Sequence, residues 1–283
     1  MRQRQATARV PASLAAGGRL TARALATAIA AAASFAVPPV AGLGTAWAQN
    51  AVVRVEERQF KAGAGRITFS ELPLGTVNPV YPPGRYGGGP DSPTVRFGGH
   101  FSGRRLAQDA ECPDGAVRTG CLAGTPSAPL SLAGTAPPAK ILADRSAPPG
   151  TTPGLAGTPS FNGPVAILFD RDVAAVGLDG GSFNAVGSTA ITVYDRQGRV
   201  LGRTANRGLR FEFLGLATAD LSARIAGLEF HLVGAEPAGF GVDNIRFGAP
   251  RDVDLPGVRP PAPTPPPPPP PAPPPVRRPP ILP

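Results

Sequence analysis

The chain has 283 residues and a formal net charge of +9, with 38 Pro, 36 Gly and only 6% aromatic residues. So much proline and glycine is typical of low-complexity segments, whereas a hydrophobic content of 42% excludes a wholly disordered chain. The sequence lacks the long uninterrupted apolar runs of a multi-span membrane protein. One globular domain with unstructured extensions is therefore expected.

The first 48 residues are organised like a secretory signal peptide. Five Arg and no acidic residue precede an Ala-rich apolar stretch at about residues 25–37, and Ala46-Trp47-Ala48 has the small-residue pattern of a cleavage site. An uncleaved membrane anchor is the alternative, although the apolar stretch is shorter than the roughly 20 residues of a membrane span. We expect cleavage after Ala48, a secreted or periplasmic protein, and no transmembrane segment in the mature chain.

The charge of the remaining chain is nearly balanced. Residues 49–250 carry 19 basic and 17 acidic side chains, and the two kinds are interspersed along the sequence. Nucleic-acid-binding proteins concentrate Lys and Arg on one face or one element. We therefore expect no nucleic-acid partner.

The prolines divide the chain into regions. There are 15 between residues 72 and 160, three between 161 and 250, and 17 between 256 and 283. Because strand interiors exclude proline, a dense sheet is expected in residues 161–250. Residues 251–283 are predicted to be a disordered, Pro-rich tail in the polyproline II conformation. Residues 102–160 are predicted to be a long Pro/Gly-rich inserted loop rather than regular secondary structure.

Short apolar stretches predict strands. The alternation is clear in residues 228–232, where three apolar side chains share one face and Glu229 and His231 share the other. Strands are expected at residues 51–60, 66–69, 94–101, 164–169, 191–194, 199–201, 209–213, 228–232 and 240–247. About nine short strands with almost no helical periodicity predict an all-β, jelly-roll-like antiparallel β-sandwich in residues 49–250.

The two cysteines bracket a turn-rich segment within the predicted insertion. Cys112 and Cys121 are nine positions apart, and the nearest histidine in the sequence is His100. In an exported protein this spacing favours a local disulfide. A metal site, which would need further Cys or His ligands, and an unpaired redox role are the alternatives.

The last predicted strand, residues 240–247, changes phase at Asp243-Asn244. Its apolar positions are even before this point and odd after it, which predicts a β-bulge or a strand that is apolar on both faces. A carboxylate at such a position needs a partner, because burying a lone charge is costly. The candidates are an arginine, a set of backbone N–H groups, or Ca²⁺, which prefers oxygen ligands.

Several segments resemble exported bacterial proteins of uncharacterised function, many of which carry PEP-CTERM sorting tails. The resemblance rests on residues 67–76, 95–97, 177–181 and 239–247. Those proteins are similar to jelly-roll carbohydrate-binding modules, in which an aspartate of the closing strand often helps to hold a structural calcium ion. The resemblance implies that Asp243 and Glu71 are calcium ligands. This chain differs in ending on a proline-rich segment instead of a PEP-CTERM transmembrane tail.

A non-catalytic binding module for polysaccharide or another cell-envelope component is the function that this resemblance implies. Sugar-binding sites use aromatic rings, against which the apolar face of a pyranose packs. Tyr81, Tyr86 and Tyr194 are therefore the candidate ligand-binding residues, and Tyr194 is expected to point outward because it is out of phase with Ile191 and Val193.

Two other functions compete with a binding module. A structural or adaptor protein of the envelope would act through the Pro-rich tail, which is able to dock into an aromatic groove. An enzyme resembling a glycoside hydrolase would need two facing carboxylates, for which Glu212 and Glu229 are the candidates. Neither His100 nor His231 belongs to a nucleophile-elbow or metal-binding motif, so we expect no catalytic activity.

Overall fold

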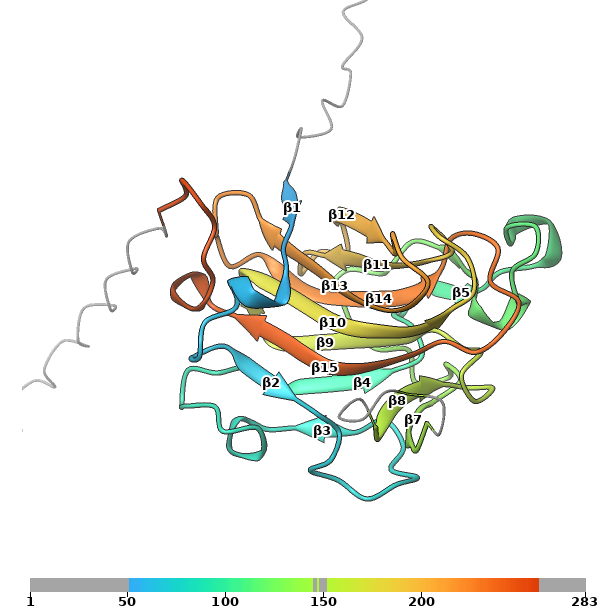
Figure 1. The fold of residues 1–283 in the computed structure, drawn as a ribbon, viewed down its shortest axis with the longest axis horizontal. Coiled ribbons are helices and arrows are strands. Elements are labelled where there is room, and N and C mark those ends of the chain that lie inside the picture. Colours follow the sequence, from blue (N-terminus) through green and yellow to red (C-terminus); the bar gives the residue numbers. More distant parts are fainter. Residues whose placement is uncertain (1–50, 145–146, 148–151, 260–283) are drawn as a thin grey trace, which may run out of the picture. The chain divides into compact units, whose positions relative to one another are not determined.

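The computed structural model describes residues 51–144, 147 and 152–259, which all belong to one compact unit (Figure 1). The signal-peptide prediction for residues 1–48 and the tail prediction for residues 260–283 lie outside these residues. Within the described ranges, no helix is long and apolar enough to cross a membrane.

The chain forms an all-β, antiparallel β-sandwich, as predicted (Figure 1). One sheet has the order β1-β13-β10-β15-β8-β7, with β2 also paired to β15. Its strands are β1 (Val52–Arg54), β2 (Gly65–Ile67), β7 (Ala139–Leu142), β8 (Gly154–Gly157), β10 (Ala175–Phe183), β13 (Arg210–Thr218) and β15 (Gly241–Gly248).

The second sheet has six strands in the order β12-β11-β14-β9-β4-β3. Its strands are β3 (Val80–Tyr81), β4 (Val95–Gly98), β9 (Val165–Val173), β11 (Thr189–Tyr194), β12 (Val200–Ala205) and β14 (Ile225–Leu232). A separate hairpin pairs β5 (Arg104–Leu106) with β6 (Leu122–Gly124). The described helical turns are all of the 3₁₀ type: η1 (Glu57–Gln59), η2 (Pro83–Arg85), η3 (Asp109–Glu111), η4 (Arg118–Gly120) and η5 (Pro250–Asp252).

The core lies between the two large sheets and takes side chains from both. Leu178 and Ile245 come from the seven-stranded sheet, and Ile167 and Phe230 come from the six-stranded sheet; all four are fully buried. Alternation along each strand places these residues inward and their neighbours on an outer face. Both outer faces are partly covered by other segments of the chain, and this covering decides which polar residues are buried.

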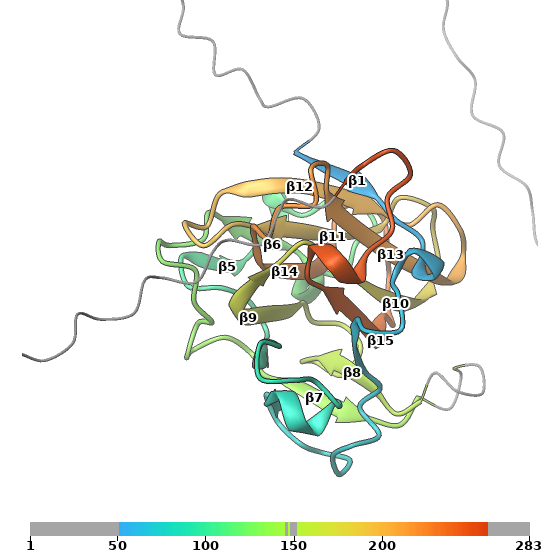
Figure 2. The ribbon, with the colours of Figure 1, turned by 90° about the vertical axis from the view of Figure 1, so that its left-hand side faces the viewer.

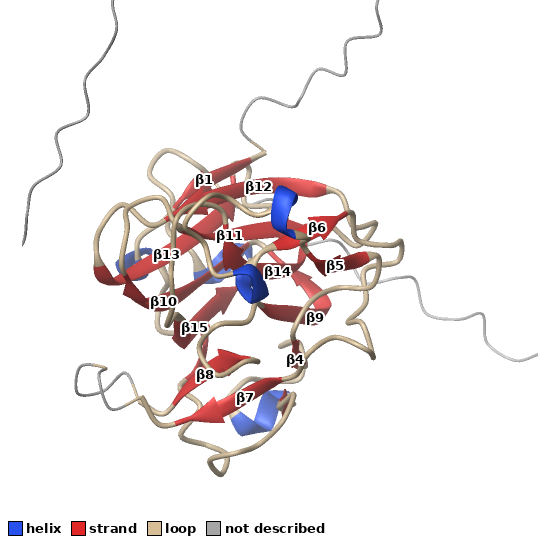
Figure 3. Cartoon of the chain, turned by 90° about the vertical axis from the view of Figure 1, so that its right-hand side faces the viewer, coloured by secondary structure: helices blue, strands red, loops and turns tan. Residues whose placement is uncertain are grey.

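The predicted insertion, residues 102–160, is not a structureless loop, so this prediction is wrong in part. Residues 139–157 add β7 and β8 to the edge of the seven-stranded sheet, and β5 and β6 lie beside β14 and β9 (Figure 3). Phe101 and Leu130 pack on the outer face of the six-stranded sheet. The strands have only three or four residues each, which is too short for a clear apolar pattern.

The predicted start of the tail at residue 251 is also wrong. Val253 and Leu255 are buried against Phe60 on the outer side of β13 and β10. The backbone N–H of Lys61 donates to the carbonyl of Asp252 (2.8 Å), which fixes the first and last described segments side by side (Figure 2). The sandwich therefore extends to about residue 258, beyond the predicted boundary at 250.

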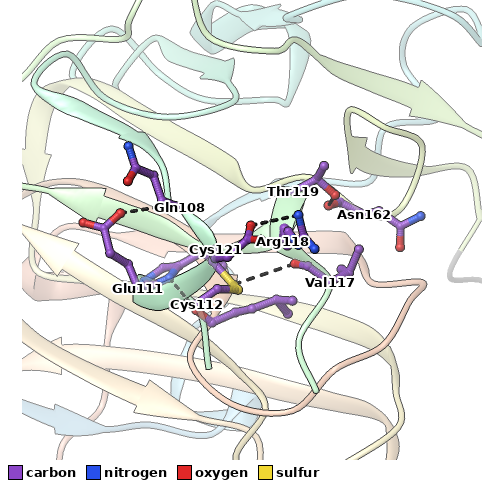
Figure 4. Close-up of a disulfide and its surroundings, with 11 residues drawn as sticks. Gln108, Glu111, Cys112, Val117, Arg118, Thr119, Cys121 and Asn162 are labelled. Carbon is purple, nitrogen blue, oxygen red and sulfur yellow. Dashed lines mark hydrogen bonds and ion pairs between the residues drawn. A yellow bond between two sulfur atoms is a disulfide. The ribbon is translucent and has the colours of Figure 1, made fainter. Parts of the chain in front are cut away.

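Cys112 and Cys121 form the predicted disulfide, with Cα atoms 5.6 Å apart (Figure 4). The bond joins the ends of two 3₁₀ turns, η3 and η4. Cys121 is buried and forms a parallel bridge with Leu232 at the end of β14. The disulfide thus ties its loop to the sandwich next to the core.

Candidate functional site

The three candidate tyrosines do not form a shared ligand site. The side chain of Tyr81 is 0% exposed and packs among phenylalanine rings of the core. Tyr86 is half-buried, stacks edge-on against Phe247, and donates its hydroxyl to the carbonyl of Pro93. A sugar cannot stack on the buried ring of Tyr81 without a rearrangement of the core.

The expectation that Tyr194 points into solvent is wrong, although its face of the strand was predicted correctly. Tyr194 lies on the outer face of the six-stranded sheet, where Phe101 covers it, and it is only 2% exposed. Its hydroxyl donates to Oε2 of Glu229 (2.8 Å), which also accepts from Nε of Arg104 (3.0 Å). These contacts bind the segment carrying Phe101 and Arg104 to the sheet.

The two glutamates considered for hydrolytic chemistry lie apart. Glu229 belongs to β14 of the six-stranded sheet and is fully buried in the contacts just described. Glu212 belongs to β13 of the seven-stranded sheet and forms an ion pair with Arg54. The two carboxylates therefore do not face a common substrate position.

The break in the apolar pattern at Asp243-Asn244 is a β-bulge, as predicted. Gly177 pairs with Arg246 and Asp179 pairs with Asp243, so one residue of β10 faces two residues of β15. Asn244 has a φ of 45°, in the left-handed region that asparagine tolerates better than most residues. The bulge places Asp243 directly opposite Asp179 on the outer face of the seven-stranded sheet.

The side chain of Asp179 has a partner. Nδ2 of Asn244 donates to Oδ2 of Asp179 (2.9 Å), and Arg66 donates to Oδ1 of Asn244 (3.1 Å). Burial raises the pKa of Asp179, and the hydrogen bond from Asn244 opposes this rise. The asparagine of the bulge therefore links Asp179 to the positive charge of Arg66.

Asp243 is less well compensated. It is only 4% exposed, and its Oδ1 atom has no hydrogen-bond partner among the described residues. Burial raises the pKa of this carboxyl to about 7; the backbone N–H of Asn244 opposes the rise, and the negative charges of Asp179 and Glu71 add to it. The sequence suggests an arginine, backbone N–H groups or Ca²⁺ as the partner of Asp243. The structure supplies the backbone N–H of Asn244.

Glu71 lies in the electrostatic neighbourhood of Asp243, but its carboxylate already has partners. Oε1 accepts hydrogen bonds from the backbone N–H (3.1 Å) and the hydroxyl (2.9 Å) of Thr68, and Oε2 is 3.5 Å from the hydroxyl of Tyr81. These bonds close the turn after β2. Glu71 thus has a local structural role that the resemblance did not indicate.

A small cavity is lined in part by Asp243. It has a volume of about 20 Å³, and Asp144 and Asp179 also line it. The rings of Phe161 and Phe211 line it as well. The volume is sufficient for one water-sized group.

Two glycines make room for these rings. Gly181 of β10 pairs with Gly241 of β15, two residues along from the Asp179–Asp243 pair and therefore on the same face. A Cβ atom at Gly181 would collide with the ring of Phe211, and one at Gly241 would lie 3.0 Å from the ring of Phe161. The cavity is thus lined by the Asp179–Asp243 pair and, two residues along the same strands, by the Gly181–Gly241 pair beside the two aromatic rings.

A larger groove adjoins this cavity and shares Asp144 and Phe161 with it. The groove has a volume of about 300 Å³ and is also lined by Ser182, Asn184 and Gly239. Asn184 donates its backbone N–H to the buried carboxylate of Glu236 (2.9 Å), which fixes this side of the groove.

A calcium ion at Asp243 and Glu71 stays a prediction. In the described part of the chain, no group of three or more His, Cys, Asp or Glu side chains is arranged to hold a metal ion. The free Oδ1 of Asp243 suits a cation, whereas the bonds from Thr68 occupy Oε1 of Glu71. Glu71 is therefore poorly suited to complete the set of about 6 to 8 oxygen ligands that Ca²⁺ takes.

Sequence reasoning missed four residues of the cavity. Asp179 was detectable only from the pairing of β10 with β15, which periodicity does not reveal. Asp144 lies within the predicted insertion, and Phe161 and Phe211 are recognisable only from the glycines that face them.

Comparison with known protein families, with characterised proteins and with solved structures finds no match to this chain.

Proposed function

We propose that the protein is an exported, non-catalytic β-sandwich module that binds a glycan of the cell envelope through the cavity at Asp243 and the adjoining groove. The observation that supports this most directly is a nearly fully buried aspartate in the lining of the cavity, whose Oδ1 has no hydrogen-bond partner among the described residues. An unsatisfied buried carboxylate oxygen destabilises the fold, so its presence is better explained by a ligand than by packing.

The surrounding side chains suit a sugar. Phe161 and Phe211 are half-buried and offer apolar ring surface, against which the apolar face of a pyranose packs. The carboxylates of Asp179 and Asp243 accept hydrogen bonds from hydroxyl or amino groups. A pocket with mostly apolar walls and a few converging polar atoms is the usual form of a small-ligand site.

Glycoside hydrolases also use a pair of carboxyl groups, so the geometry of the Asp179–Asp243 pair must be compared with theirs. Those enzymes hold the scissile bond between two carboxyl groups. The cavity at Asp179 and Asp243 has room for a single water-sized group, and Oδ2 of Asp179 is bound by Asn244. Binding without cleavage therefore fits the geometry better.

Pull-down on insoluble cellulose, chitin, chitosan and peptidoglycan tests this function. We expect the mature protein to bind at least one polymer, Phe211→Ala to weaken that binding, and no soluble sugar to be released. Phe213→Ala is the matched control, because Phe213 lies two residues further along the same strand and packs on Phe60 instead of lining the cavity. No retention on any polymer, or equal retention of all three proteins, would refute the proposal.

The adaptor alternative depends on residues outside the described ranges. A deletion that tests it should begin at residue 260, because Val253 and Leu255 belong to the packed domain. Under the proposed function, the shortened protein binds the same polymer as the full mature chain. Loss of that binding on deletion of the tail would favour the adaptor instead.

A further inference from the structure

We infer that the cavity at Asp243 binds a primary ammonium group, and that the ligand is an amino sugar with a free amine whose ring lies in the adjoining groove. This inference rests on the proposed glycan-binding function and names the class of sugar. It is carried by the orphan oxygen of Asp243, by the carboxylate of Asp179 directly opposite, and by the aromatic walls of the cavity.

The charge of the site calls for a cation. Like charges directly opposite each other on neighbouring strands are unfavourable, and burial increases the cost. Asn244 binds one of the carboxylates, that of Asp179, through its side chain. A positive group beside Oδ1 of Asp243 would satisfy that atom and reduce the repulsion between the two aspartates.

The walls of the cavity favour an organic cation over a metal ion. Ca²⁺ needs oxygen ligands on most sides, whereas the cavity is lined by Phe161, Phe211 and the Gly181–Gly241 pair as well as by its three aspartates. Aromatic rings attract ammonium groups through the negative charge on their faces. Carboxylates combined with aromatic rings are therefore suited to bind an alkylammonium head.

The size of the cavity selects the kind of ammonium. A volume of about 20 Å³ is sufficient for one group of the size of water, which matches a primary ammonium and is too small for a guanidinium or a trimethylammonium. The groove of about 300 Å³ shares Asp144 and Phe161 with the cavity. A ligand that fills both has a small cationic head directly attached to a polar ring.

Isothermal titration with glucosamine and N-acetylglucosamine near neutral pH tests this inference. The two sugars differ only in that acetylation removes the charge of the amine and enlarges the head. We expect glucosamine to bind at least about tenfold more tightly, the size of effect typical of a hydrogen bond to a charged group. Asp243→Asn should remove this preference.

The variants remain interpretable because Asp243→Asn deletes a buried charge and is expected to stabilise the fold. Glu71→Gln is the matched control, since Glu71 lies near Asp243 but does not line the cavity. We expect it to bind glucosamine like the unsubstituted protein. Loss of glucosamine binding in Glu71→Gln, or an unchanged preference for glucosamine over N-acetylglucosamine in Asp243→Asn, would place the site elsewhere and overturn the inference.

Other outcomes also decide the matter. Equal affinity for the two sugars, or no binding of either, would overturn the inference. Butylamine binding as tightly as glucosamine would refute the amino-sugar assignment, and calcium that binds at Asp243 and resists displacement by glucosamine would refute the ammonium assignment. Retention on chitin or cellulose through Phe211 without any preference for glucosamine would leave the glycan-binding function intact and remove only this inference.

Discussion

Asp243 and Asp179 face each other directly across β15 and β10, and the carboxyl of Asp243 is buried with one oxygen that has no partner among the described residues. The bulge at Asn244 creates this pairing, because it shifts the register by one residue within β15. In the absence of a cation, the arrangement costs folding free energy. It is therefore measurable in stability as well as in binding.

The first prediction concerns the pH dependence of folding. The pKa of Asp243 is raised by burial from 3.8 to about 7, so between about pH 4 and pH 7 the native state holds a proton that the unfolded chain releases. Stability should therefore fall as the pH rises through this window. Above about pH 7, Asp243→Asn should be more stable than the unsubstituted protein by a few kcal/mol, as measured by urea unfolding.

The titration of His231 also changes the stability with pH, in the direction opposite to that of Asp243. Burial lowers its pKa to about 3, so its contribution to stability falls as the pH decreases below about 6.5. The two effects have opposite signs, so the difference between Asp243→Asn and the unsubstituted protein isolates Asp243. A difference that is the same at pH 5 and pH 8 would contradict the burial of an ionised Asp243.

The second prediction concerns the covering of the six-stranded sheet. Glu229→Ala removes the acceptor for Tyr194 and Arg104 and leaves the Arg104 side chain, which is 10% exposed, without its countercharge. We expect a loss of about 3 to 5 kcal/mol in the free energy of unfolding. The exposed pair of Asp220 and Arg224 is the control, and Asp220→Ala should cost about 1 kcal/mol or less. A loss in Glu229→Ala no larger than this control would show that the contact is not structural.

The third prediction concerns calcium. Because Thr68 binds Oε1 of Glu71 and two phenylalanines line the Asp243 cavity, we expect the melting temperature to be the same in EDTA and in calcium at equal ionic strength. A bound ion would raise it by mass action. A calcium-dependent rise that both Asp243→Asn and Glu71→Gln abolish would establish the calcium site that the resemblance implies.

The fourth prediction concerns the disulfide. In the chain-entropy account, closing the short loop between Cys112 and Cys121 contributes about 2 to 3 kcal/mol. The double substitution of both cysteines by serine should lower the free energy of unfolding by at least this amount, because Cys121 also packs in the core, and should leave the protein folded. A protein that fails to fold without the bond would show that the loop contributes more than its closure.

The sequence predicted the strand-rich body and the bulge because both depend on local alternation. It did not predict the burial of Tyr194 and Glu229, which lie on the expected outer face but are covered by the segment that contains Phe101. It also missed the packing of Val253 and Leu255, whose short segment has little pattern of its own. Whether an outer face is covered depends on residues far away in the sequence, so the periodicity of the covered strand does not predict it.

The candidate site shows the same division. Asp243 was identified from the phase change in its own strand, whereas Asp179 and the two rings became visible only through strand register and contacts across strands. Residue type makes the tyrosines candidates, but the ring of Tyr81 lies in the core and Tyr194 lies under a covering segment. Residue type alone did not distinguish a packed ring from one that lines a cavity.

A crystal structure of residues 49–283 soaked with glucosamine tests the ammonium site most directly. We expect the sugar nitrogen at about 2.7 to 2.9 Å from Oδ1 of Asp243, with the ring extending past Phe161 into the groove. A metal ion at Oδ1, or glucosamine bound elsewhere with the cavity unchanged, would contradict it.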